Sequence, residues 1–66
     1  MKKRLYCYEG AVWNGDVIYN SVELYVHAYS PRQALELLKI RIKADHPMIS
    51  YIQLKEENLH EEDTNL

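Results

Sequence analysis

The reactive side chains of this 66-residue sequence are few, and their spacing does not indicate a catalytic or metal-binding centre. The single cysteine, Cys7, alternates with apolar residues and is expected to be a small buried hydrophobe. A cysteine nucleophile needs a base beside it, whereas His27 is expected on the opposite face of the sheet. His46 and His60 fall in a predicted loop and in the tail, without the close ligand pairs of zinc sites. We therefore expect no catalytic residue, no metal, no cofactor and no enzymatic activity.

Tyrosine dominates the aromatic residues, because the chain has six tyrosines and one tryptophan but no phenylalanine. A tyrosine ring favours burial while its hydroxyl needs a polar partner, so this bias favours half-exposed surfaces over a dry core. A surface of that kind binds a partner more readily than it performs chemistry. Whether the tyrosines gather on one surface depends on the elements that carry them.

Length and charge limit the kind of protein this is. The chain is long enough for one small domain, and a single cysteine excludes an internal disulfide, so a reducing cytoplasm is the expected compartment. No apolar run follows the basic N-terminus, so neither a signal peptide nor a membrane span is expected. Five of the ten acidic residues follow Lys55. Residues 56–66 are therefore predicted to be an acidic, disordered tail beyond a domain of residues 1–55, serving solubility or mimicking a phosphate backbone.

Alternation of residue types predicts a β-hairpin with strands over residues 4–13 and 16–28. Asn14-Gly15 between them is a strong signal for a two-residue turn, and with this turn Tyr6 pairs with Glu23 and Tyr8 with Ser21. That register produces an apolar face and a tyrosine face. The apolar face comprises Leu5, Cys7, Ala11, Ile18, Val22, Leu24 and Val26; the tyrosine face comprises Tyr6, Tyr8, Tyr19, Tyr25 and His27. A bulge near Gly10 would instead flip Val12 and Trp13 relative to the rest.

The segment after the hairpin predicts a helix over residues 31–45. Ser30 is a suitable N-cap, proline suits the first helical position, and Gln33 completes a capping box. The helix should end before His46-Pro47, because a residue ahead of proline avoids helical angles. Its apolar stripe comprises Ala34, Leu35, Leu38 and Ile42. Ile40 lies away from this stripe and either extends a contact surface or caps the sheet edge.

Residues 48–55 alternate again and predict a third strand, with Ile52 and Leu54 facing the helix and Tyr51 joining the tyrosine face. The expected fold is a single two-layer α+β domain of ββαβ order, with a three-stranded, mainly antiparallel sheet and one helix on one face. The third strand most simply lies beside the first, giving the order 2-1-3. A parallel placement beside the second strand remains open.

The hairpin followed by residues 28–35 and by Ile52-Gln53-Leu54-Lys55 resembles small ββαβ proteins in architecture. These include a family of archaeal ribosomal proteins and some tiny phage-encoded inhibitors of host defence. The similarity spans about residues 4–56 and rests on the helix cap and the strand alternation. It implies the same arrangement of elements, and no functional residue is carried over from either group.

One helix covers one sheet face, which leaves the tyrosine face to water or to a partner. Three explanations of these tyrosines remain open. They are present only because tyrosine forms strands well, they form a protein interface, or they form a platform on which nucleic-acid bases stack. We predict a small non-enzymatic module that binds a protein partner or its own copy as a homodimer, with no membrane and no small-molecule substrate. The predicted partner-binding residues are Tyr6, Tyr8, Tyr19, Tyr25, His27 and Tyr51. The alternative is a protein that binds nucleic acid or regulates a nucleoprotein, such as a phage or mobile-element inhibitor of a host complex, with nucleic-acid contacts from Lys2, Lys3, Arg4 and Lys55.

Overall fold

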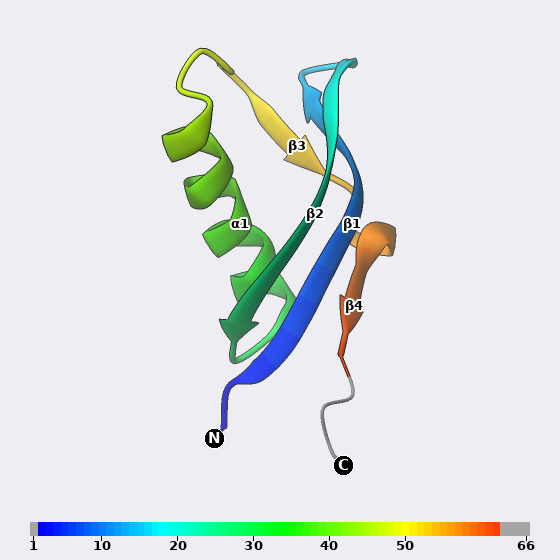
Figure 1. The fold of residues 1–66 in the computed structure, drawn as a ribbon, viewed down its shortest axis with the longest axis vertical. Helices are drawn as coiled ribbons and strands as arrows, with labels where there is room; N and C mark the ends of the chain where they lie inside the picture. Colours follow the sequence, from blue (N-terminus) through cyan, green and yellow to red (C-terminus); the bar gives the residue numbers. More distant parts are fainter. Residues whose placement is uncertain (1, 63–66) are drawn as a thin grey trace.

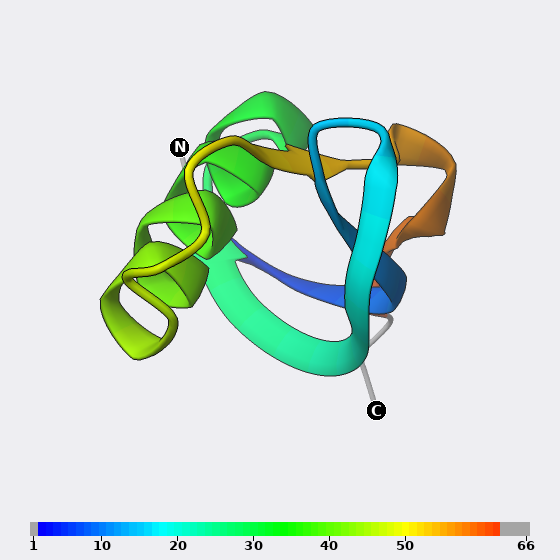
Figure 2. The same ribbon diagram turned by 90° about the horizontal axis from the view of Figure 1, so that it is seen from above.

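Two long antiparallel strands, β1 (Arg4–Asn14) and β2 (Val17–Ala28), form the centre of the structure, a computed structural model that describes residues 2–62 (Figure 1). Helix α1 (Pro31–Asp45) follows β2 and lies against one face of the curved sheet (Figure 2). The chain then forms β3 (Ile52–Leu54), a short 3-10 helix η1 (Glu56–Asn58) and β4 (Leu59–Glu61). The sheet order is β2-β1-β3, with β4 also paired to β1, so the predicted α+β class and the third strand beside the first are confirmed.

The third strand is interrupted, with β3 and β4 lying in succession along β1. β3 pairs with the end of β1 at Val12–Asn14, and β4 pairs with its beginning at Tyr6–Tyr8. Between them η1 approaches β1 at Gly10, where an added Cβ would lie 2.7 Å from Cγ of Asn58. Glycine is favoured there because a Cβ would force the Asn58 side chain to move, and because the φ of Gly10 is 156°. The expectation of a tail without regular structure is therefore wrong for residues 56–61, while residues 63–66 lie outside the described part.

The helix has the predicted bounds and the predicted N-cap residue, Ser30, but the Gln33 side chain bonds one residue before the N-cap. The Gln33 amide N–H donates to the Ser30 hydroxyl at 3.1 Å, and the Gln33 side-chain oxygen accepts from the Tyr29 amide at 2.7 Å. The helix buries Ala34, Leu38 and Ile42. Within residues 2–62 no helix has the length and apolar character needed to cross a membrane.

The hairpin turn lies one residue later than predicted. Its central residues are Gly15 and Asp16, because Asn14 pairs with Val17. Only Gly15 has a positive φ, of 65°, which a type II′ turn requires at its first central position. Asn14 instead keeps strand geometry while its side-chain oxygen accepts a hydrogen bond from the Tyr51 amide at 3.1 Å.

A β-bulge near the turn shifts the register a second time. Val12 pairs with Asn20 and Trp13 with Ile18, so Tyr19 is the extra residue. The later turn shifts the predicted pairing by two positions and the bulge shifts it by one more, so that Tyr6 pairs with Val26 and not with Glu23. Because the total shift is odd, the faces of β1 are inverted relative to those of β2. The bulge lies at Val12/Trp13 and not near Gly10, the position considered from the sequence.

The observed register buries Tyr6 and Tyr8, whose predicted position on an exposed tyrosine face is wrong. They are 3% and 0% exposed, and they pair with Val26 and Leu24 on the side that α1 covers. Cys7 is buried as predicted, with 4% exposed, but on the face away from the helix. Leu5 and Ala11 share that outer face, and Ile18 is exposed, so these positions also differ from the predicted apolar face.

The core lies between α1 and the inner face of the sheet. One cluster, near the hairpin turn, contains Val12, Ile42 and Ile49 with Val22, Leu24, Ile52 and Leu54 packed against it. The other, near the chain start, contains Tyr6, Ala28 and Ala34 with Val26 and Leu59. The predicted inward positions of Ile52 and Leu54 are confirmed.

Candidate functional site

The residues of the predicted tyrosine face are distributed over several parts of the molecule. Tyr25 and His27 lie on the outer face of β2 and are exposed. Tyr19 lies beside the end of α1, where its ring packs edge-on against His46 with ring centres 5.4 Å apart. Tyr51 is exposed beside β3. With Tyr6 and Tyr8 in the core, the structure brings no continuous tyrosine surface together.

The buried hydroxyl of Tyr8 explains why a tyrosine occupies a core position. It donates a hydrogen bond to the Ala11 carbonyl at 2.7 Å and accepts one from the Lys55 amide at 3.0 Å. Both partners are backbone groups next to the η1 interruption, where regular strand pairing ends. Part of the tyrosine bias is therefore structural, because phenylalanine would leave both backbone groups without this partner.

Cys7 has two polar neighbours on the outer face of the sheet, Tyr25 on β2 and His60 on β4, each directly opposite it. Burial raises the pKa of the Cys7 thiol above its ordinary 9.0, and a hydrogen bond with Tyr25 only partly offsets this. The same hydrogen bond, with Cys7 and then Glu23 adding charge repulsion, raises the pKa of Tyr25 to about 12. A buried thiol that stays protonated at neutral pH is a poor nucleophile despite the histidine opposite it. No group of three or more potential metal ligands occurs among residues 2–62.

The basic residues predicted to contact nucleic acid do not form one patch. Lys3 lies over the Tyr29 ring at 5.6 Å, and Arg4 forms an ion pair with Glu61 at 3.3 Å. Lys55 follows β3, which pairs with the far end of β1, about 25 Å away at the usual rise of a strand. Lys55 instead lies over the Trp13 ring at 5.3 Å.

Exposed apolar side chains gather at the end of the molecule that carries the hairpin turn. We call this the apolar end; it comprises Val17, Ile18, Met48 and Tyr51. Their exposed fractions include 77% for Met48, 64% for Val17 and 61% for Tyr51. The turn and the α1–β3 loop lie at the same end of the fold (Figure 1) and are joined by a hydrogen bond from the Gly15 amide to the Tyr51 carbonyl at 2.8 Å.

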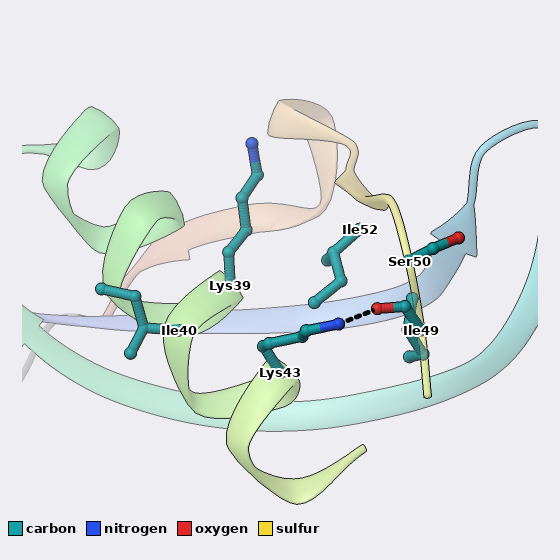
Figure 3. Close-up of a pocket in the computed structure, with 6 residues that line it drawn as sticks. All are labelled: Lys39, Ile40, Lys43, Ile49, Ser50 and Ile52. Atoms are coloured by element: carbon teal, nitrogen blue, oxygen red, sulfur yellow. Dashed lines mark hydrogen bonds between the residues drawn. The ribbon is translucent and has the colours of Figure 1, made fainter. Parts of the chain in front are cut away.

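Next to the apolar end, two adjoining hollows form a groove between α1 and β3. The first, of about 370 Å³, is mainly apolar and is lined by Lys39, Ile40, Lys43, Ile49, Ser50 and Ile52 (Figure 3). The second, of about 360 Å³, runs along β3 and is lined by Lys39, Tyr51, Ile52, Gln53, Leu54 and Lys55. Because Lys39 and Ile52 line both hollows, they form one continuous surface, which we call the α1–β3 groove.

The charge of the α1–β3 groove is opposite to that of the whole chain. Three of its lining residues are lysines and none is acidic, although the formal net charge of the chain is −2. Lys43 donates to the carbonyls of Pro47, at 2.8 Å, and Ile49, and so closes the loop after α1 (Figure 3). Lys39 and Lys55 form no ion pair with any residue from 2 to 62. Their positive charges are therefore not neutralised by a carboxylate of the described residues, although the Lys55 amine also lies over the Trp13 ring.

The sequence identified two members of this site and missed its position. Tyr51 is predicted to contact a partner, and Ile40 either to extend a contact surface or to cap the sheet edge; both residues line the groove. Val17 and Ile18 are exposed at the tip of the hairpin, next to a bulge that the alternation pattern does not reveal. Comparisons of the chain with protein-family models, with curated protein sequences and with solved structures found no match.

Proposed function

We propose that this protein is a small non-enzymatic interaction module that binds another protein through the apolar end and the adjoining α1–β3 groove. The observation that carries the proposal is the concentration of exposed apolar side chains at one end of the fold. Single exposed apolar residues are ordinary, whereas several at one end of a small fold are a candidate binding surface. Because Tyr6 and Tyr8 are core residues, the binding surface lies at this end and not across the outer sheet face.

The chemistry of the remaining surface supports binding over catalysis. Cys7 is buried with a raised pKa, which removes the one strong nucleophile of the chain from use at neutral pH. The α1–β3 groove combines an apolar floor with lysines at its rim, an arrangement common at protein interfaces. Apolar burial at such a surface supplies affinity, and the rim charges select the partner.

The proposal is tested by comparing complexes formed by matched variants in the native cell. The double variant Val17→Ser, Met48→Ser removes apolar area at the apolar end, and Tyr29→Ser removes an exposed ring at the other end as a control. We expect a stoichiometric complex, foreign or homodimeric, that survives Tyr29→Ser and is lost in the double variant. Quantitative mass spectrometry after affinity capture and sedimentation velocity of the purified chain are the measurements. A complex retained equally by both variants, or a chain that is monomeric and uncomplexed, would contradict the proposal.

A further inference from the structure

We propose that the α1–β3 groove binds an extended acidic peptide segment, which adds to the free edge of β3 as a further strand. This inference rests on the proposed function and names the partner chemistry of the same surface. β3 is an edge strand among the described residues, since it pairs with β1 on one side only. A free strand edge presents unpaired backbone groups that a second chain can use.

The hydrogen bonds around β3 show which of its backbone groups face outward. The Tyr51 carbonyl accepts from Gly15 and the Tyr51 amide donates to Asn14, so both groups of Tyr51 point toward β1. Backbone groups alternate in direction along a strand. Those of Ile52 and Leu54 therefore point away from β1, into the groove. They provide two donors and two acceptors for an added strand.

The apolar hollow accommodates a side chain of such a strand. Side chains of an added strand alternate between the two faces of the sheet. Those on the helix side would enter the hollow formed by Ile40, Ile49 and Ile52 (Figure 3). Ile40 is 67% exposed and gains most from being covered. A branched apolar residue at that position of the peptide fits this lining.

The rim of the groove favours acidic residues on either side of that apolar position. Lys39 lies at the junction of the two hollows, and Lys55 lies at the end of β3. A carboxylate of the peptide beside either lysine amine adds electrostatic attraction, which acts over a long range at low salt and is screened at high salt. Binding of an acidic peptide should therefore weaken as salt is added.

The same charges argue against a second copy of this chain as the occupant. Pairing of β3 with β3 across a twofold axis brings identical surfaces together. The interface would then hold Lys39 and Lys55 from both copies while no acidic residue lines either groove, and an accumulation of like charge in an interface is unfavourable. A foreign acidic segment meets no such repulsion.

The test uses the full chain and a ten-residue peptide with capped ends, in which valine alternates with glutamate or aspartate. The comparison peptide has the same sequence with lysine at every acidic position. Binding is measured by fluorescence anisotropy, and amide exchange is measured by NMR. We expect saturable binding of the acidic peptide only, weakened by salt, with slower exchange at the Ile52 and Leu54 amides. Lys39→Glu should weaken binding about tenfold, through reversed charge at the rim. Arg32→Glu, the same charge change two turns earlier on α1, should leave binding within about twofold.

Each outcome separates this inference from the proposed function. Equal binding of the two peptides, or unchanged exchange at Ile52 and Leu54, overturns strand addition with acidic selectivity. If the native complex still depends on Val17 and Met48, the proposed function then stands without this inference. If the native protein forms no complex that depends on Val17 and Met48, and the peptide does not bind either, both proposals are overturned. A β3-dependent homodimer in sedimentation would identify a second copy as the occupant and overturn the choice of an acidic partner.

Discussion

Replacing Tyr8 by phenylalanine tests the register that places this residue in the core. The substitution keeps the ring and removes a hydroxyl that bonds to the Ala11 carbonyl and the Lys55 amide at 2.7 and 3.0 Å. Tyr8 is fully buried, so the two backbone groups lose their partner in a place that water reaches poorly. Leaving a buried polar group without a hydrogen bond costs about 1–3 kcal/mol. We expect the free energy of unfolding to fall by roughly 2 kcal/mol, which lowers the Tm of so small a domain by about 10 °C.

Urea unfolding followed by the fluorescence of Trp13 measures this difference directly. Tyr6→Phe and Tyr25→Phe are the matched controls, one on the same inner face and one on the outer face. The Tyr25 hydroxyl bonds to the Glu23 carboxylate and the Cys7 thiol but to no backbone group of the described residues, so each control should cost clearly less than Tyr8→Phe, about 1 kcal/mol or less. If all three variants were equally stable, Tyr8 would not be the buried bridge that the structure shows, and the register would be in doubt.

Two further predictions concern η1 and the outer sheet face. Gly10→Ala should destabilise the protein by roughly 1–3 kcal/mol in urea unfolding, because the new Cβ would lie 2.7 Å from Cγ of Asn58. Adding Asn58→Ala should restore part of the lost stability. If the effects of the two substitutions were strictly additive in the double variant, this contact would be refuted. The raised pKa values of Cys7 and Tyr25 mean that the folded state holds their protons to higher pH than the unfolded state, whose values are 9.0 and 10.0. The contribution of Cys7 is therefore complete below about pH 9 and is lost at higher pH, and that of Tyr25 is complete below about pH 10 and is lost as pH rises through about 12. Urea midpoints across this range should fall less in Cys7→Ser than in the wild type, and equal falls would argue against the thiol as the cause.

The sequence predicted the elements of the candidate site better than their assembly. It indicated that Tyr51 is exposed and that Ile40 lies off the buried stripe of the helix, because both follow from local periodicity. It gave no sign that Lys39 and Lys55, sixteen positions apart, line adjoining parts of one groove. That proximity arises from the packing of α1 across β3. Residues 56–61 were misassigned for a related reason, since β4 is too short to show an alternation of its own.

Helix α1 and the order of the elements were determined by the sequence itself, because the bonds that cap the helix at Ser30 and Gln33 join residues within four positions of each other. The faces of the sheet were decided only by the tertiary structure. Asn14 is held in strand geometry by the Tyr51 amide, thirty-seven positions away, and this moves the turn onto Gly15. Moving the turn by one residue shifts the pairing by two positions, which leaves the faces unchanged. The bulge at Tyr19 adds one more position, and this odd shift turns Tyr6 and Tyr8 inward, since side chains alternate with a period of two.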